Sequence, residues 1–124
     1  MDSGVERLTD DSRTLAPGEL FIAIKGELTD GRMYLPSALE KGAGCLLVQG
    51  DPPPSVLQAA SASGCPCLKV EDSLAAYQQL ALWHRAQFPQ ARILAITGSC
   101  GKTSTKEMCA AILEEHFPGG VLKT

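Results

Sequence analysis

The sequence predicts an α/β fold in which parallel strands alternate with helices. Short apolar runs recur along the chain, each of a length typical of a buried strand. Between them lie segments in which apolar residues recur every three or four positions, the spacing of a helix with one buried face. Glycine and proline residues separate the two kinds of segment. Alternating strands and helices are typical of parallel pairing, because consecutive parallel strands need a crossover connection.

Four apolar runs are the predicted strands, at residues 20–24, 45–48, 67–70 and 92–97. The first, "LFIAI", follows the turn signal Ala-Pro-Gly, and the last, "RILAIT", is rich in aliphatic residues. Short apolar runs bounded by turn residues are typical of buried strands in a parallel sheet.

Four helices are predicted between and after these strands. Pro36 suits the first turn of a helix that the glycines of "KGAG" end. A short helix is expected at 56–62, and Asp72 or Ser73 can cap the next one. The last helix is expected at 102–116. The residues expected to share one side are Leu35, Ala38, Leu39 and Gly42 in the first helix, Leu74, Tyr77, Leu80, Ala81, His84 and Phe88 in the third, and Met108, Ala111, Ile112 and Glu115 in the fourth.

The chain is expected to hold two parts with a boundary near Pro89. Residues 1–88 would form a small N-terminal α/β domain, and residues 89–124 hold one strand, a glycine loop and one helix. One parallel strand with one helix cannot close a core by itself. We therefore expect the second part to be the start of a larger parallel-sheet domain, and the chain to be the front portion of a longer protein.

The bulk composition narrows the functional classes. The net charge is −3 and the chain has no basic patch, which argues against nucleic-acid binding. No apolar run approaches the roughly 20 residues of a membrane helix. The N-terminal stretch is acidic and polar, unlike a signal peptide. We therefore expect a cytoplasmic protein without membrane insertion, and a monomer.

The five cysteines are an odd number, and the spacing Cys65-Pro66-Cys67 differs from the CxxC of redox and zinc sites. Reduced, mostly buried thiols are expected in a cytosolic protein. Cys100 is the exception, because it lies in a loop that should be exposed. Its place before a helix N-terminus predicts an unusually reactive thiol.

The stretch "TGSCGKTS" carries the clearest chemical signal. A helix is expected to begin at Lys102, and its first backbone amides would favour an anion because they have no partner within the helix. Gly98 and Gly101 allow the backbone to approach a phosphate closely. Lys102 can reach terminal phosphates, and the Thr103 hydroxyl can coordinate Mg²⁺. The predicted nucleotide-binding residues are Gly98, Ser99, Cys100, Gly101, Lys102, Thr103 and Ser104.

The glycine spacing of this loop departs from the standard phosphate-loop pattern. That pattern places a glycine where this chain has Ile96, whereas here the glycine is Gly98, giving G-x-x-G-K-T. A plain strand-to-helix turn with an incidental lysine is the alternative. The position directly after an apolar run and before a helix favours phosphate binding, because the mechanism requires that context.

The residues "AITGSCGKTSTKEM" resemble the ATP-binding loop of the Mur ligases, the ATP-dependent amide ligases of peptidoglycan synthesis, which use the spacing T-G-S/T-x-G-K-T. A second segment, "DDSRTLAPGELFIAIKGELTDGR", is similar to the N-terminal domain of the same family. The resemblance covers nearly the whole chain. It implies a small domain for the UDP end of the substrate, followed by the first strand, phosphate loop and helix of a central ATPase domain.

Within the family, the serine of "TGSCGKT" and the following "TKEM" resemble the enzymes that add D-alanyl-D-alanine to a UDP-N-acetylmuramoyl-tripeptide. The resemblance implies that ATP phosphorylates the tripeptide carboxylate and that the amine of D-alanyl-D-alanine attacks the acyl phosphate. Lys102, on the β- and γ-phosphates, and Thr103, on Mg²⁺, are the implied catalytic residues. The residues implied to hold the UDP end are Ser12, Arg13, Lys25 and Gly26. A surface turn with Arg13 in an ion pair is the alternative for the first two.

Three alternative functions stay open. The related ligases that add the third residue, diaminopimelate or lysine, share the N-terminal D-S-R block. A non-catalytic module that binds the UDP substrate or a nucleotide would keep the fold without the chemistry. A small kinase would need an acceptor site and a lid within the few residues after the loop. Because the remaining central-domain residues and the C-terminal domain of the family are missing, this chain is not expected to ligate by itself.

Overall fold

The structure is a computed structural model that describes residues 4–124. The chain divides into two compact units, of which the first ends at Phe88 and the second runs from Pro89 to Thr124. The first unit combines a parallel sheet with helices, which confirms the predicted α/β class.

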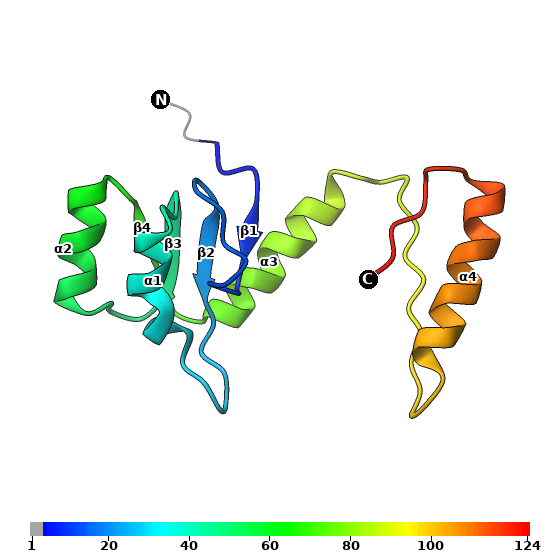
Figure 1. The fold of residues 1–124 in the computed structure, drawn as a ribbon, viewed down its shortest axis with the longest axis horizontal. Helices are drawn as coiled ribbons and strands as arrows, with labels where there is room; N and C mark the ends of the chain where they lie inside the picture. The colour runs from blue at the N-terminus through cyan, green and yellow to red at the C-terminus, as the bar shows by residue number, and fades with distance from the viewer. Residues whose placement is uncertain (1–3) are drawn as a thin grey trace. The chain divides into compact units, whose positions relative to one another are not determined.

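The first unit is built on a four-stranded parallel sheet (Figure 1). Its strands, in spatial order, are β1 (Leu8–Thr9), β2 (Leu20–Ala23), β3 (Cys45–Gln49) and β4 (Cys67–Val70). The strands predicted at 20–24, 45–48 and 67–70 are confirmed, with small shifts at their ends. The sequence pattern does not reveal β1, because so short a strand carries no periodicity.

Helices form the crossovers from β2 to β3 and from β3 to β4, and α3 follows β4. The helices of this unit are η1 (Gly31–Tyr34), α1 (Leu35–Glu40), α2 (Pro54–Ser63) and α3 (Ser73–Ala86). Pro36 lies in the first turn of α1, as predicted. Gly64 ends α2 in the left-handed conformation, with φ 69°. The Asp72 carboxylate caps α3 by accepting a hydrogen bond of 2.9 Å from the Ala75 amide.

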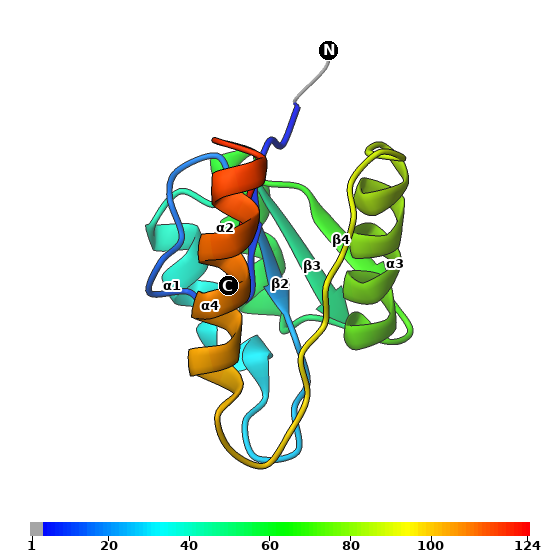
Figure 2. The same ribbon diagram turned by 90° about the vertical axis from the view of Figure 1, so that its right-hand side faces the viewer.

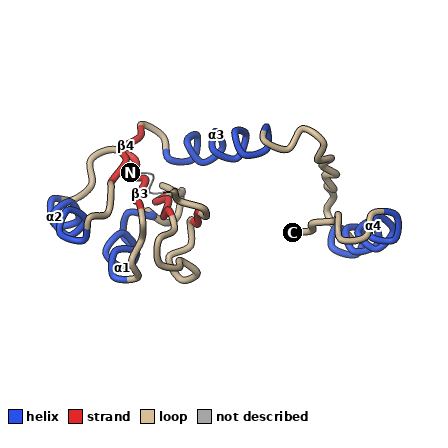
Figure 3. The backbone as a smooth tube through the Cα atoms, turned by 90° about the horizontal axis from the view of Figure 1, so that it is seen from above, coloured by secondary structure: helices blue, strands red, loops and turns tan. Residues whose placement is uncertain are grey.

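The sheet is covered on both faces (Figures 2 and 3), by α1 and α2 on one side and by α3 on the other. Phe21 and Ile22 are neighbours in β2 and point to opposite faces, and both are fully buried. The first core cluster contains Leu15, Phe21, Ala23, Leu35, Ala38, Ala43, Leu46, Val48, Val56, Ala60 and Cys65. The second contains Leu20, Ile22, Cys45 and Leu47. Burial on both faces explains why β2 and β3 consist of continuous apolar runs.

The helix faces agree with the predicted ones only in part. Leu35 and Ala38 of α1 are buried as predicted. In α3 the side that packs on the sheet contains Ala76, Tyr77 and Leu80. The predicted face of α3 is wrong for its other four residues, because these are exposed: Leu74, Ala81, His84 and Phe88. Their spacing is helical, but α3 contacts the sheet mainly through its first half.

The second unit consists of an extended segment, a glycine turn and α4 (Lys102–His116), whose bounds are those predicted. The strand predicted at 92–97 is wrong: these residues form no strand in the described part of the chain. A strand exists only where a neighbour completes its hydrogen bonds, and apolar composition alone does not supply one. The segment is irregular, and Ile93 and Leu94 are exposed.

The packed side of α4 also differs from the predicted side. Met108 and Ile112, expected to share one side, are 66% and 59% exposed. The half-buried residues of the helix are Lys106, Cys109, Ala110 and Leu113. The end of the chain lies along α4, because Lys106 donates to the Thr124 carbonyl and Lys123 pairs with Glu107.

A membrane-spanning helix is not found among residues 4–124, because none of the helices described there combines the necessary length and apolarity.

Candidate functional site

The residues predicted to hold the UDP end follow two adjacent strands. Ser12 and Arg13 come after β1, and Lys25 and Gly26 come after β2. The two strands are parallel, so their carboxyl ends lie at the same edge of the sheet. This edge is where open α/β sheets bind ligands. The structure thus brings these four residues to one edge of the first unit, whereas the glycine loop 98–104 belongs to the second unit.

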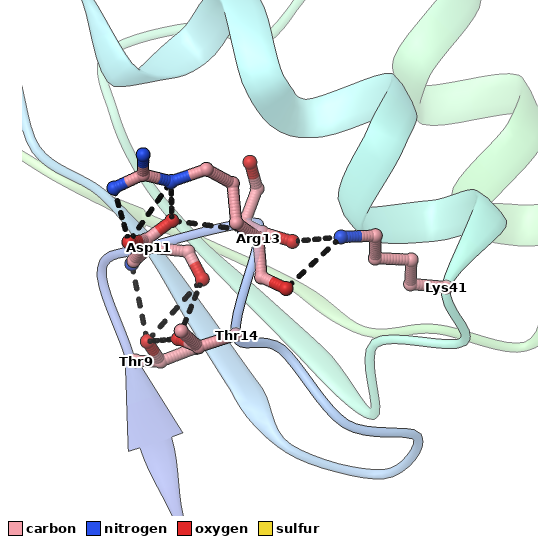
Figure 4. Close-up of polar contacts among 6 residues, drawn as sticks. Thr9, Asp11, Arg13, Thr14 and Lys41 are labelled. Carbon is pink, nitrogen blue, oxygen red and sulfur yellow. Dashed lines mark hydrogen bonds and ion pairs between the residues drawn. The ribbon is translucent and has the colours of Figure 1, made fainter.

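The turn after β1 is ordered by its own ion pair (Figure 4). The Asp11 carboxylate accepts from Arg13 Nε at 2.9 Å, from Arg13 Nη2 at 2.8 Å and from the Arg13 backbone amide at 2.9 Å. These hydrogen bonds from Arg13 lower the pKa of Asp11 to about 2. The Arg13 side chain remains 87% exposed, so the guanidinium is oriented and yet accessible. The surface turn with a paired Arg13, the alternative from the sequence, is present.

Further hydrogen bonds fix the backbone of this turn. Thr9 Oγ1 accepts from the Asp11 amide at 3.1 Å, and Thr14 Oγ1 donates to the Asp11 carbonyl at 3.1 Å. Lys41, which ends α1, donates from Nζ to the carbonyl oxygens of Ser12 and Arg13 (Figure 4). Ser12 is buried, with 8% of its surface exposed. The turn is therefore tied to α1 through backbone groups, which leaves the Arg13 side chain at the surface.

The loop after β2 is closed by backbone hydrogen bonds. The Gly26 amide donates to the Thr29 carbonyl, and the Gly31 amide donates to the Ile24 carbonyl, both at 2.9 Å. Lys25 and Asp30 form an isolated antiparallel bridge. Lys25 and Gly26 are exposed. The loop thus has a defined shape, with its tip accessible.

Gly31 permits this closure. A Cβ at this position would lie 2.6 Å from the Ile24 carbonyl oxygen and 2.7 Å from the Ile24 nitrogen. Only glycine allows so close an approach of two backbone segments. The loop therefore requires a glycine at position 31.

Asp30 and Arg32 were not among the predicted site residues. Arg32 donates to Asp30 Oδ2 at 2.6 Å from Nη2 and at 2.9 Å from Nε, and Nε also donates to Oδ1 at 3.1 Å. These bonds lower the pKa of Asp30. Both residues border an open hollow of about 610 Å³. The other residues that line the hollow are Met33, Asp51, Pro52, Pro53 and Pro54. The sequence signal for this pair is the D-G-R run, in which the arginine lies two residues after the aspartate.

A buried serine of α3 contacts the loop after β2. Ser73, the first residue of α3, accepts a hydrogen bond from the Lys25 amide at 3.2 Å. Its hydroxyl donates to Gln49 Oε1 at 3.3 Å. From the sequence, Ser73 is predicted only as a possible helix cap, because a serine before a helix carries no signal of burial.

The glycine loop of the second unit precedes α4 directly. Gly101 has φ 74°, a left-handed conformation that favours glycine. The Lys102 ammonium folds back over the loop and donates to the Gly98 carbonyl. In the described part of the chain no side chain caps the N-terminus of α4. The first amides of this helix are thus placed to bind an anion, with the Lys102 charge beside them.

The accessibility of this loop also suits a ligand. Residues 98–104 are all exposed. Within residues 4–124 no group of three or more His, Cys, Asp and Glu side chains could hold a metal ion. In this loop the Thr103 hydroxyl is the group that could join oxygens of a bound nucleotide in holding Mg²⁺.

The sequence profile of the "Mur ligase family, catalytic domain" matches residues 5–85, more than half of the chain. The chain belongs to the Mur ligase family. The resemblance predicted from the D-S-R block and the glycine loop is thereby confirmed. The two ordered loops at one edge of the sheet lie within the matched residues.

Among curated Mur ligases, the UDP-N-acetylmuramoyl-tripeptide–D-alanyl-D-alanine ligase of Escherichia coli is 44% identical over 114 residues, 92% of this chain and 23% of that enzyme. The solved structure of MurF from Acinetobacter baumannii matches with a TM-score of 0.72 at 32% identity, covering 90% of this chain and 22% of that one. MurF from Thermotoga maritima, solved in complex with ADP, matches with a TM-score of 0.69 at 27% identity, covering 93% and 25%. The chain thus spans about a quarter of the length of these relatives.

Proposed function

We propose that this chain is part of an ATP-dependent ligase that adds D-alanyl-D-alanine to a UDP-N-acetylmuramoyl-tripeptide. The observation that carries the proposal is the 44% identity to a ligase of that name, which extends over 92% of the chain and so includes both candidate loops. Relatives with this activity in their name recur among the matches, from Synechocystis at 40% identity to Treponema pallidum at 36%.

The second unit supplies the nucleotide site in this proposal. The loop 98–104 would wrap the phosphates through the amides at the start of α4, and Lys102 would swing from the Gly98 carbonyl to the β- and γ-phosphates. Thr103 would coordinate Mg²⁺ through its hydroxyl. The left-handed Gly101 and the uncapped helix start support this assignment, as does the ADP bound by the Thermotoga relative.

The first unit supplies the site for the UDP end of the substrate. Arg13 is the cation for the diphosphate, because its guanidinium is held by Asp11 and remains accessible. Ser12 and the Lys25-Gly26 loop complete the site at the same edge of the sheet. A preorganised arginine binds an anion at a lower entropic cost than a mobile one.

Bound ATP supplies the phosphoryl group that activates the tripeptide carboxylate towards the incoming amine. The residues of this chain contribute positioning and charge neutralisation, with Lys102 at the transferring phosphoryl group and the first unit holding the remote end of the substrate. The chain covers about a quarter of its relatives, and we propose that these residues bind but do not ligate by themselves. The need for ATP favours the cytoplasm as the location.

A chimaeric enzyme tests the proposed function. This chain replaces the matching segment of the Escherichia coli ligase, and phosphate release is measured with ATP, UDP-N-acetylmuramoyl-tripeptide and D-alanyl-D-alanine. We expect release that requires all three compounds and that the same chimaera carrying Lys102→Ala lacks. A folded chimaera that releases no phosphate above the Lys102→Ala background would contradict the proposal and favour the non-catalytic module.

A further inference from the structure

Ser73 is a polar residue that is excluded from solvent. It is fully buried, whereas Ser12 and Glu19, the other buried polar residues in the described part of the chain, each keep 8% of their surface exposed. Burying a hydroxyl is unfavourable unless its hydrogen bonds are replaced. Alanine would fill most of this space without that cost. The serine therefore indicates a role for its hydrogen bonds.

Both hydrogen-bonding functions of the hydroxyl are used. Ser73 Oγ accepts from the Lys25 amide at 3.2 Å and donates to Gln49 Oε1 at 3.3 Å. The Ser73 amide donates to the same Gln49 oxygen at 3.3 Å. Three segments meet at this hydroxyl: the loop after β2, the end of β3 and the start of α3.

The position of Ser73 is itself fixed by its helix. Asp72 caps α3, and Ala76, Tyr77 and Leu80 pack the helix on the sheet. The hydroxyl is thus held in place by its helix, and its partner is the loop that begins at Lys25. The backbone hydrogen bonds from Gly26 to Thr29 and from Gly31 to Ile24 join residues within the loop or at its ends. Ser73 connects the loop to a distant part of the chain, 48 residues away.

The contact is made with the Lys25 backbone and not with its side chain. It therefore sets the path of the backbone at the residue where the predicted substrate loop starts. Loss of the hydroxyl would leave the Lys25 amide without this acceptor, and the loop would shift to give the amide another partner.

We infer that Ser73, held by Gln49, is a positioning residue that keeps the Lys25-Gly26 loop in the conformation that binds the UDP end of the substrate. The inference rests on the proposed function, and it adds that substrate affinity depends on a residue that does not touch the substrate. We expect nucleotide affinity at the loop 98–104, which belongs to the second unit, to be unchanged by loss of this contact.

The test compares two ligands on this chain by calorimetry. UDP-N-acetylmuramoyl-tripeptide probes the first unit, and Mg-ADP probes the second. We expect Ser73→Ala and Gln49→Ala each to weaken the UDP ligand by about tenfold and to leave Mg-ADP within twofold, as estimated for the loss of one buried hydrogen-bonded contact. Ser73→Thr restores the hydroxyl and should restore the affinity. Ser63→Ala, an exposed serine at the end of α2, is the matched control and should change neither.

A second readout follows the loop itself. Hydrogen exchange at the Lys25 amide should become faster in Ser73→Ala and return to the original rate in Ser73→Thr. A folded Ser73→Ala or Gln49→Ala variant with unchanged affinity for the UDP ligand would overturn the inference. Equal weakening of both ligands would also overturn it, since that result indicates a general loss of stability. If the unsubstituted chain binds Mg-ADP but not the UDP ligand, the proposed substrate site fails, and the inference fails with it.

Discussion

The Asp11 carboxylate and the Arg13 guanidinium are joined side by side across one turn, by bonds of 2.9 Å and 2.8 Å from Nε and Nη2. The pair lies directly after β1, at the sheet edge that faces ligands in open α/β folds. The Asp11 carboxylate thus orients the Arg13 guanidinium, and the guanidinium in turn stabilises the ionised form of Asp11.

The first prediction concerns the titration of Asp11. The carboxylate should titrate at about 2 in the folded chain, below its ordinary value of 3.8, because Arg13 stabilises the ionised form. The contribution to stability is present above the unfolded value and is lost as the pH falls through about 2. Arg13→Ala should move the pKa back towards 3.8, as measured by the pH dependence of the carboxyl carbon shift. Arg92→Ala is the control, and an equal midpoint in the Arg13 and Arg92 variants would contradict the pairing.

The second prediction concerns the loop after β2. Gly31→Ala places a methyl group 2.6 Å from the Ile24 carbonyl oxygen, so the two backbone segments must separate. We expect a loss of about 1–3 kcal/mol in the free energy of unfolding, measured in urea. Gly4→Ala is the matched control, because nothing lies within 4 Å of a Cβ at Gly4, and it should stay within about 0.5 kcal/mol. Equal stability of both variants would show that the loop is not closed as described.

The third prediction concerns the core of the first unit. Leu46 is fully buried between the sheet and the helices, and Leu46→Ala should lower the free energy of unfolding by about 2–5 kcal/mol. Leu82, on α3, is 69% exposed, and Leu82→Ala should change stability by about 0.5 kcal/mol or less. Urea unfolding of both variants checks the difference. A Leu82→Ala variant as unstable as Leu46→Ala would place a packing partner on the outer side of α3.

The fourth prediction concerns Cys100. Its thiol is exposed in the glycine loop, whereas Cys45 and Cys65 are buried. Iodoacetamide should modify Cys100 first, and saturating Mg-ADP should slow that reaction by about tenfold or more, because the phosphates would cover the loop. Cys109, half-buried on α4, is the internal control and should react at the same rate with and without nucleotide. Equal rates at Cys100 in both conditions would argue against a nucleotide at this loop.

The sequence predicts most elements because local signals suffice for them. The start of α4 at Lys102 follows from the glycine before it, and the end of α2 follows from Gly64. The features that the sequence does not predict depend on neighbours. The run at 92–97 has the composition of a strand, but no described strand pairs with it. Likewise, helical spacing identifies a possible face in α4, but the packing decides which side is covered.

The candidate site shows the same division. The glycine loop and the D-S-R block are contiguous in sequence, so they can be recognised there. The contact between Ser73 and Lys25 joins residues 48 positions apart and depends on how α3 packs on the sheet. The sequence allows an ion pair of Arg13 as an alternative, and the turn geometry decides that Asp11 is its partner. The long-range contact of Ser73 with Lys25 carries no local sequence signal.

The most direct test of the account is the affinity of this chain for Mg-ADP when Lys102 is replaced. Lys102→Ala removes the ammonium that lies over the loop, and the affinity measured by calorimetry should fall by about tenfold or more, since hydrogen bonds to charged groups contribute about 1.5–3 kcal/mol. Lys69→Ala, at an exposed lysine of β4, should leave the affinity unchanged. Binding of Mg-ADP by the folded Lys102→Ala chain as tightly as by the Lys69→Ala chain would contradict a nucleotide site at the loop 98–104.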